Sequence, residues 1–384
     1  MVKVDAQHEE FSQIIREFAA KEIEPIAKEI DRTNSVPDSL IKKGVELGLP
    51  GIGVREEYGG TGAGMLSLAI VVEEISRISA ACSVVFVASY LVSEPLQEFG
   101  TEEQKRRFLV PLAKGQKFGA HAMTEPGAGS DVAGIQTTAR KDDGEYVING
   151  RKIFITNGDR ADIFLVFART TPPPSPDKRH LGITAFLIER GTPGLQTGKK
   201  IETMGLRGSQ PVEIILDQVR VPKENILGRE GEGAYVALNT YDRGRIGVSA
   251  QGVGIAQAAY EAALKYAATR TAFESRLLEF QQVQFKLAEM AVDLHSARLL
   301  TYWAASLLDQ GKDFVKAASI AKIVATEAAE KAALAAMMIH GAYGVATDYP
   351  VERYLRDVQI IKTYEGTNDI QRLTIAKELI KELR

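Results

Sequence analysis

The segment Ile361-Lys362-Thr363-Tyr364-Glu365-Gly366-Thr367-Asn368-Asp369-Ile370-Gln371-Arg372 places one carboxylate in a short loop before the last helix. Gly366 permits a tight turn or the close approach of another molecule. Asn368 with Gln371 three residues later has the form of a capping box, and the spacing of apolar residues from Ile370 onward predicts a final helix. Free amides at a helix start can bind an anion or a carbonyl. Glu365 is therefore either a functional carboxylate or a helix-entry residue worth under about 1 kcal/mol.

The composition excludes several classes of protein. The 384 residues predict two or three domains, and 47 basic against 50 acidic side chains give a net charge of −3. No basic block indicates a nucleic-acid partner or an anionic membrane. No apolar run approaches the roughly 18 residues of a membrane span. Cys82 is the only cysteine, so an internal disulfide and a Cys₂His₂ zinc site are impossible, and no metal site is expected. A cytoplasmic protein without a membrane span is predicted.

The periodicity of apolar residues changes twice along the chain and predicts an α+β multidomain protein. An N-terminal all-α domain is expected over 1–117, with a pair of buried helices in 66–98. A middle β domain, a small barrel or sandwich, is expected over 118–228, and a C-terminal four-helix bundle over 229–384. The order α, β, α lacks βαβ alternation and argues against a Rossmann nucleotide fold.

Individual elements can also be predicted. The run 145–155 contains Asn149-Gly150 between β-rich stretches, which predicts a hairpin turn. Further strands are expected at 163–168, 183–188 and 212–216. The bundle helices are expected at 231–243, 246–269, 281–310 and 313–339.

Six separate stretches then agree with one family. They are Thr124-Glu125-Pro126-Gly127-Ala128-Gly129-Ser130-Asp131, Ile153-Phe154-Ile155-Thr156-Asn157-Gly158, Val221-Pro222-Lys223-Glu224-Asn225, Asp242-Arg243-Gly244-Arg245, Tyr349-Pro350-Val351-Glu352-Arg353, and Tyr364-Glu365-Gly366-Thr367 with Gln371-Arg372. In this order and at these spacings the chain resembles the acyl-CoA dehydrogenases over essentially its whole length. Through Gly244-Arg245-Ile246-Gly247 and the 284–300 helix it looks most like the short-chain, butyryl-CoA branch.

The resemblance implies a reaction. An acyl-CoA would be dehydrogenated to the trans-2-enoyl-CoA with FAD as cofactor, and electrons would pass to an electron-transferring flavoprotein. Removal of the weakly acidic α-proton needs a carboxylate base and a polarised thioester carbonyl, and burial in an apolar pocket can raise a carboxyl pKa into the working range. The resemblance implies that Glu365 is the base and that its N–H, with a ribityl hydroxyl, binds the carbonyl oxygen. Other branches carry a glutamate where this chain has Gly244.

The resemblance also assigns binding residues and an assembly. Arg270, Phe273 and Gln281, together with 338–342, would reach the ADP part of FAD on a neighbouring subunit, which implies a homotetramer built as a dimer of dimers. The substrate residues would be Ser130, Asp242, Arg245, Tyr364 and Gly366. The full set of FAD residues would be Met123, Thr124, Gly129, Ser130, Phe154, Ile155, Thr156, Arg270, Phe273, Gln281, Met338, Gly341, Ala342, Thr367 and Asp369.

Simpler interpretations and rival functions stand beside these assignments. The 124–130 loop could be an ordinary glycine turn, Phe154 and Thr156 part of a plain strand, and 242–245 a solvated helix end. Met338, Ala342 and Glu274 depart from the family pattern at the expected ADP site. His340 could contact a phosphate or simply end a helix. One rival function is an enoyl-CoA reductase in an electron-bifurcating complex. The other is a non-catalytic CoA- or partner-binding paralogue that has lost FAD.

Overall fold

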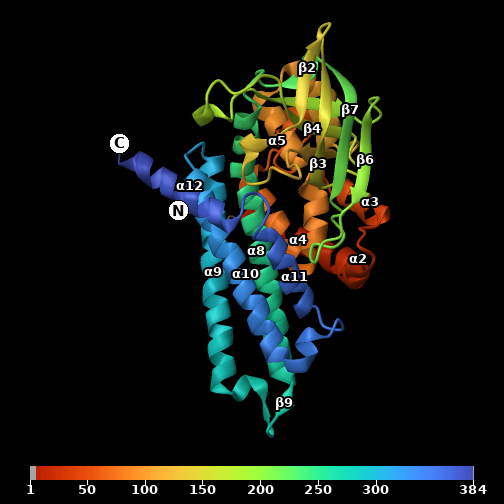
Figure 1. The fold of residues 1–384 in the computed structure, drawn as a ribbon. Coiled ribbons are helices and arrows are strands. Elements are labelled where there is room, and N and C mark those ends of the chain that lie inside the picture. Colours follow the sequence, from red (N-terminus) through yellow and green to blue (C-terminus); the bar gives the residue numbers. More distant parts are fainter. Residues whose placement is uncertain (1–5, 384) are drawn as a thin grey trace.

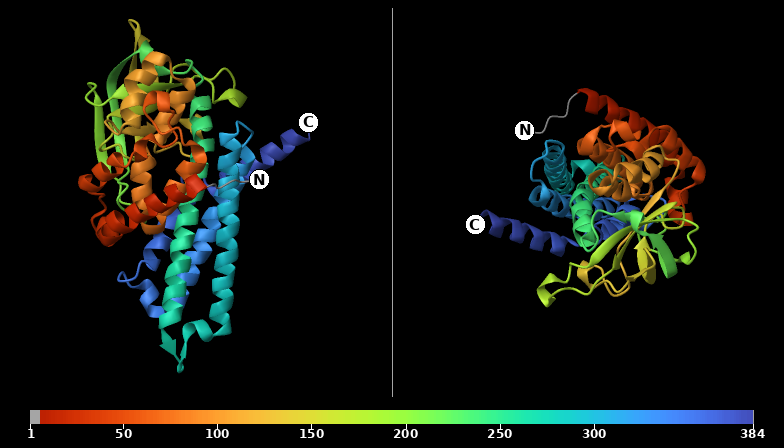
Figure 2. Two further views of the ribbon diagram at one scale, coloured as in Figure 1. Left: turned by 180° about the vertical axis from the view of Figure 1, so that it is seen from behind. Right: turned by 90° about the horizontal axis from the view of Figure 1, so that it is seen from above.

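A computed structural model describes residues 6–383, so the first five residues of the expected N-terminal domain lie outside it. A β sheet and short helices occupy one end of the molecule, and long helices extend from it to the opposite end (Figure 1). The view from behind shows the same arrangement, with the last helix projecting from the side of the bundle (Figure 2). The predicted class, helical then β then helical, is confirmed.

The N-terminal part is helical and surrounds one apolar helix. The helix α4 carries buried side chains around its whole circumference, as expected for a helix packed on all sides. With α5 it forms the predicted pair of buried helices. A capping box between Thr101 and Gln104 starts the next helix. The helices of this part are α1 Ala6–Phe18, α2 Ala27–Thr33, α3 Asp38–Glu46, α4 Gly64–Val87, α5 Tyr90–Phe99, α6 Glu102–Gln104 and α7 Val110–Ala113.

The middle part is an eight-stranded sheet in the order β6-β7-β3-β2-β4-β5-β8, with β1 beside β4. β4 and β5 are almost continuously apolar and buried, so both faces of these two strands are covered. Because β1 and β4 are parallel while most other pairs are antiparallel, the sheet is mixed. The strands are β1 Gly119–Ala122, β2 Thr138–Asp142, β3 Glu145–Ile155, β4 Ile163–Arg169, β5 Ile183–Glu189, β6 Leu195–Lys200, β7 Val212–Pro222 and β8 Ile226–Leu227.

Of the two forms expected for the β domain, a barrel or a sandwich, the barrel is not formed, because across residues 6–383 the described strands follow an open path ending at β6 and β8. One other expectation about this sheet is wrong. The Asn149-Gly150 pair does not make a turn, because β3 runs straight through it and the hairpin turn lies at Asp143-Gly144, both at positive φ. Gly150 is needed for close packing instead, since a Cβ there would lie 2.3 Å from Thr137 Oγ1.

The C-terminal part is built on three long helices, with α11 packed against α8 and α10. The predicted break between 243 and 246 is wrong, since one helix spans both segments. Glycines of this long helix, α8, allow neighbouring helices to approach closely. A Cβ on Gly252 would lie 2.8 Å from the Ala325 backbone, and a Cβ on Gly254 would lie 2.4 Å from the Glu73 carbonyl. The elements are α8 Gly233–Thr269, β9 Thr271–Ala272, β10 Ser275–Arg276, α9 Gln281–Asp309, α10 Val315–His340, α11 Val351–Ile361 and α12 Asn368–Glu382.

Within residues 6–383, no single helix has the length and apolar character to cross a membrane. The bent pair formed by α4 and α5, with 45° between its halves, satisfies both criteria together. In the folded chain most side chains of α4 are buried.

Candidate active site

The loop between α11 and α12 has an unusual backbone. Glu365 has a φ of +52° and Gly366 a φ of +84°, so two successive residues are left-handed. For a glutamate this conformation costs on the order of 1–2 kcal/mol, and such strain persists where the surroundings enforce it. Gln371 holds this backbone conformation in place, because its side-chain amide donates to the carbonyls of Glu365 (3.2 Å) and Gly366 (2.9 Å). The expected Asn368 cap is wrong: the N-cap is Thr367, whose hydroxyl accepts from the Ile370 N–H.

The carboxylate of Glu365 is arranged as a base. Its Oε2 atom is buried and has no hydrogen-bond partner among the described residues. Burial raises the pKa of Glu365 to about 7, against the opposing positive charges of Arg245 and Lys322. A buried, unpaired carboxylate with a pKa near 7 can accept a proton at neutral pH.

Gly244 on α8 faces this carboxylate. A Cβ built at Gly244 would lie 2.9 Å from Glu365 Oε2 and 3.3 Å from Leu91. The two positions therefore share one pocket, as the resemblance implies, and a side chain at 244 would displace the carboxylate.

An apolar cavity of about 90 Å³ lies beside Glu365. Tyr364 donates a hydrogen bond to the Gln251 side chain, and the Gln251 amide donates to Ser83 Oγ at 3.1 Å. These polar side chains meet at the wall of an otherwise apolar space. The cavity is lined mainly by α4, α5 and α8, through Met65, Leu68, Val72, Val84, Val87, Ala88, Leu91, Gly247 and Val248.

Glu365 also lies in the wall of a larger cleft of about 500 Å³, which collects most of the predicted residues. Arg245 lies in its wall, is nearly fully buried, and donates to the Asp242 carboxylate. The predicted residues in this cleft are Thr124, Gly129, Ser130, Phe154, Ile155, Thr156, Arg245, Tyr364, Glu365, Gly366 and Thr367.

The glycine loop at the cleft is fixed from behind. Glu125 and Ala128 exchange backbone hydrogen bonds at 3.0 and 3.1 Å. The Glu125 carboxylate accepts from the N–H groups of Gln136 and Thr137, and from Lys152 Nζ at 2.8 Å. Lys152 is fully buried and also donates to the carbonyl of Met123. Met123 is therefore tied to β3 through its backbone, and the loop is held rigid before any ligand arrives.

The cleft has features that fit a cofactor with a flat ring system. Phe154 is 56% exposed and has a φ of +58°, so an aromatic ring is held open in a strained conformation. No atom lies within 4 Å of a Cβ built at Gly127 or Gly129, so the loop leaves open space beside its backbone. These residues fit FAD. Residues 6–383 contain no cluster of three His, Cys, Asp or Glu side chains suited to a metal ion.

Comparison with known proteins identifies the family. Models of the acyl-CoA dehydrogenase N-terminal, middle and C-terminal domains match residues 5–116, 120–219 and 231–380. The chain belongs to the acyl-CoA dehydrogenase family. It is therefore a member of a family of oxidoreductases that act on the CH–CH bond of acyl-CoA, and the members of this family are flavoproteins.

Three relatives show how close the match is. The chain is 47% identical over 369 residues to an acyl-CoA dehydrogenase of Bacillus subtilis, covering 96% of each chain. It is 43% identical over 376 residues to a 3-(aryl)acrylate reductase of Clostridium sporogenes, covering 98% of this chain and 99% of that one. It superimposes on the butyryl-CoA dehydrogenase of Megasphaera elsdenii with a TM-score of 0.95 at 42% identity, covering 98% and 99%.

The remaining predicted residues lie away from the cleft. Asp369 faces outward and pairs with Arg372. Arg270 and Phe273 lie beside β9, at the end of the bundle opposite the sheet (Figure 1). Gln281, Met338, Gly341 and Ala342 likewise do not line the cleft. Phe273 is 93% exposed and Met338 is 68% exposed. Phe273 and Met338 therefore present free apolar surface at this end of the chain.

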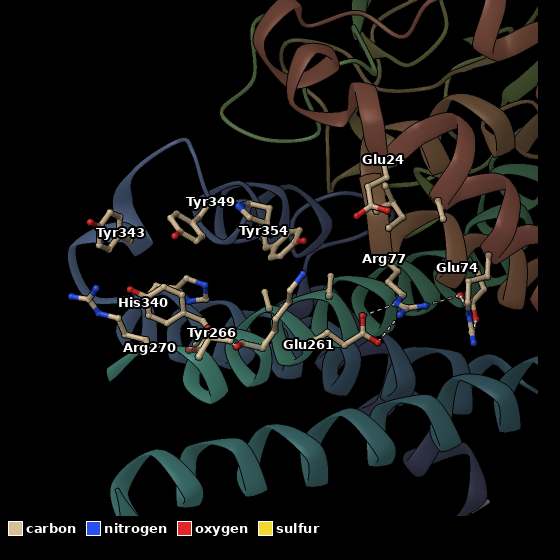
Figure 3. A pocket seen from close by; sticks show the side chains of 18 residues that line it. Glu24, Glu74, Arg77, Glu261, Tyr266, Arg270, His340, Tyr343, Tyr349 and Tyr354 are labelled. Carbon is tan, nitrogen blue, oxygen red and sulfur yellow. Dashed lines mark hydrogen bonds and ion pairs between the residues drawn. The ribbon is translucent and has the colours of Figure 1, made fainter. Parts of the chain in front are cut away.

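A separate polar pocket of about 850 Å³ lies along α8 near this end (Figure 3). In it His340 stacks on Tyr266 with ring centroids 4.1 Å apart, and Arg270 lies over the ring of Tyr343. His340 is buried and donates through Nδ1 to the carbonyl of Ala336. His340 ends α10 and is buried against Tyr266, and its contact with a phosphate stays a prediction.

Some residues of the acyl-CoA dehydrogenase cleft were not anticipated from sequence. His121 Nδ1 donates to the Leu91 carbonyl, so its Nε2 accepts from the Tyr241 hydroxyl at 3.1 Å. Burial lowers the pKa of His121 to about 4, which keeps the ring neutral. Lys152 and Lys322 were also missed, although each is a lysine within an apolar pattern, and that mismatch is a usable signal.

Proposed function

We propose that this protein oxidises a short-chain acyl-CoA to the trans-2-enoyl-CoA, with Glu365 as the base. The observation that carries the proposal is the buried, unpartnered Glu365 Oε2 between an apolar cavity and a cleft suited to a flavin. The bond that breaks first in this scheme is the α-C–H, whose proton moves to Oε2. When bound, FAD would accept the β-hydride and its two electrons, so a C=C bond replaces two C–H bonds.

The chain's own groups would prepare the substrate for this step. The carbonyls of Glu365 and Gly366 accept hydrogen bonds from Gln371, whereas the Glu365 N–H has no hydrogen-bond partner within residues 6–383. That N–H is available to the thioester oxygen and would stabilise the negative charge that develops on it. Arg245 and Asp242 would bind the CoA arm, with Ser130 at the cleft mouth. Phe154, Thr156 and the 123–130 loop would hold FAD.

The preference for a short chain rests on the cavity. A volume of about 90 Å³ has room for a few methylene groups, and the Tyr364–Gln251–Ser83 hydrogen bonds oppose its extension by an apolar chain. A longer chain would have to leave these polar groups unpaired, at a cost of about 1–3 kcal/mol for each.

We further propose FAD binding across subunits in a homotetramer and electron transfer to an electron-transferring flavoprotein. The support for assembly is a row of apolar side chains seven residues apart on α9, Phe285, Val292 and Leu299, all more than half exposed. Such a row on a soluble helix is typical of an interface. The exposed Phe273 and Met338 at the expected ADP site also point to a second subunit.

The reverse reaction, reduction of an enoyl-CoA, is the second candidate. The likeness to an aryl-acrylate reductase favours it, because the same base would then donate the α-proton. The proposed residues serve either direction, so the cavity alone does not choose between them.

An anaerobic titration of the purified protein with saturated CoA thioesters of increasing length tests the proposal. Rapid bleaching of oxidised flavin absorbance, greatest for about four carbons, is the expected result. A yellow protein bleached by none of the thioesters, but whose reduced form is reoxidised by enoyl-CoA, would favour the reductase. A colourless protein that takes up no FAD would favour the non-catalytic paralogue and overturn the proposal.

A further inference from the structure

A lysine is buried directly behind the Glu365 loop. Lys322, on α10, is fully buried. Its Nζ lies 3.0 Å from each of three acceptors, the Lys362 carbonyl, the Gly366 carbonyl and Asn368 Oδ1. An ammonium group has three N–H donors and no acceptor, so all three of its donors are satisfied. A neutral amine would place its lone pair against one of these oxygens, so the geometry selects the charged form.

Two of the three acceptors belong to the loop that carries Glu365, and the third, Asn368, is the first residue of α12. Lys362 precedes Glu365 and Gly366 follows it, so one ammonium group attaches both halves of the loop to α10. Asn368 is itself held by Thr326, one turn further along α10, whose hydroxyl accepts from the Asn368 amide at 3.0 Å. With these carbonyls directed to interior donors, the loop keeps the left-handed turn in which the Glu365 N–H has no hydrogen-bond partner among residues 6–383.

The positive charge also acts on the Glu365 carboxylate. Burial lowers the pKa of Lys322 to about 7, whereas the negative charge of Glu365 opposes that shift. In return, Lys322 is one of two cations that oppose the effect of burial on Glu365. The titratable and charged groups facing this pair are Arg245 and Tyr241 from α8, Lys362 from the end of α11 and Tyr364 from the loop itself.

We propose that Lys322 is a positioning residue for Glu365. Its ammonium group fixes the 362–368 loop in the left-handed turn and supplies the positive charge that keeps the neighbouring carboxylate ionised. The expected change in turnover rests on the proposed function, whereas the expected change in the titration of Glu365 does not. A lysine that served only to attach the loop to α10 would affect stability and leave the titration of Glu365 unchanged.

The test compares Lys322→Met with wild type by infrared spectroscopy as a function of pH. The carboxylic acid band of residue 365 is assigned by its loss in Glu365→Gln, so the measurement needs no turnover. Methionine has about the length of the lysine stem and carries no charge. The expected result is a rise of about one pH unit in the titration midpoint of Glu365. The acid limb of the kcat–pH profile would move with it, and turnover at pH 6 would fall about tenfold.

Leu294→Ala is the matched control. Leu294 is a buried core residue of α9 that lies in neither cavity, so its truncation lowers the melting temperature without touching the loop. Its Glu365 midpoint is expected to stay at the wild-type value. An unchanged midpoint in Lys322→Met would overturn the proposal, even if that variant were less stable and less active.

A second variant covers the case in which Lys322→Met does not fold. Lys322→Ala leaves a cavity that a small alkylammonium ion can enter. Ethylammonium is expected to move the midpoint of Glu365 back toward the wild-type value in a saturable way, whereas ethanol is not. Equal effects of the two additives would contradict the role of charge. Failure of the wild-type protein to oxidise any acyl-CoA would overturn the proposed function, while the infrared midpoints would still decide the role of Lys322.

Discussion

The Glu365 loop and the Arg270 end of the bundle are both parts of the site that the sequence predicts, yet their environments are opposite. At the loop, one chain supplies a buried carboxylate, its backbone support and two cations, and the carbonyls of Lys362, Glu365 and Gly366 accept from side-chain donors. At the far end, Phe273 and Met338 are exposed and enclose nothing. Chemistry that needs a desolvated charge is prepared within one chain, whereas we propose that a neighbouring subunit completes the far end. Substitutions at the two ends should therefore differ in the size of their effects and in the property they change, which is the reaction rate at the loop and FAD affinity at the far end.

The largest effect is expected from Glu365→Gln. The substitution keeps the shape of the side chain and removes the base, so the rate of flavin reduction by acyl-CoA should fall by about 10³-fold or more, with FAD content unchanged. Single-turnover bleaching measures it. Glu94→Gln is the control, because Glu94 is another buried carboxylate whose pKa burial raises, to about 8, but it pairs with Arg243 and does not line the cavity. A larger rate loss in the Glu94 variant than in the Glu365 variant would move the base to Glu94.

The same variant tests how stability depends on pH. Because burial raises the pKa of Glu365 from 4.5 to about 7, the folded state holds a proton that the unfolded state has already lost in that range. Stability is therefore lost as pH rises from 4.5 to 7, by at most about 3 kcal/mol from this group. Glu365→Gln should lose less stability than wild type over that interval. Denaturant unfolding at pH 5 and pH 8 gives the difference, and parallel curves for the two proteins would contradict a buried Glu365.

The sequence predicts the loop better than it predicts the glycines around it. Motif order placed Glu365, Phe154 and the 124–130 residues in one cleft. Gly150 and Gly244 were interpreted as a turn and a helix break, but both lie inside regular elements. Single-sequence patterns register the flexibility of glycine, whereas the reason for these residues is a neighbour distant in sequence, Thr137 in one case and the Glu365 carboxylate in the other.

Lys322 was missed for a related reason. In isolation a lysine in an Ala-rich helix indicates a solvated position. Lys322 instead falls on the buried stripe with Ala318, Ala325 and Ala329, three or four residues apart. That spacing is visible in the sequence, but the three acceptors that make burial possible come from a loop about 40 residues away. Tertiary partners of this kind leave no local pattern.

A smaller and positive effect is expected when the base is moved. The structure places Gly244 so close to the carboxylate that both side chains cannot fit, so the swap needs a small residue at 365. Glu365→Gly suits the positive φ at that position, and adding Gly244→Glu should raise flavin reduction at least tenfold above the single variant, because a carboxylate returns to the same pocket. Adding Tyr235→Glu instead is the control, since that exposed residue of the same helix lines neither the cavity nor the cleft. Equal rates in the two double variants would mean that position 244 does not direct a carboxylate at the substrate.

The smallest effect is expected at the far end, where Met338 departs from the family pattern and its side chain has no hydrogen-bond donor. Met338→Gln adds an amide to an exposed helix position, and its N–H donors could reach a cofactor held partly by a neighbouring subunit. FAD should be retained a few-fold more tightly, in line with the net value of one hydrogen bond, about 0.5–1.5 kcal/mol, with no change in the rate of the reductive step. Equilibrium dialysis of FAD measures the change. Leu334→Gln is the control, because it adds the same group to an exposed position of the same helix one turn earlier. Equal gains in FAD affinity from both substitutions would reflect general solubility. A gain confined to Met338→Gln would place the ADP part of FAD against this end of α10. The two ends would then differ because only this one needs a second subunit to be complete.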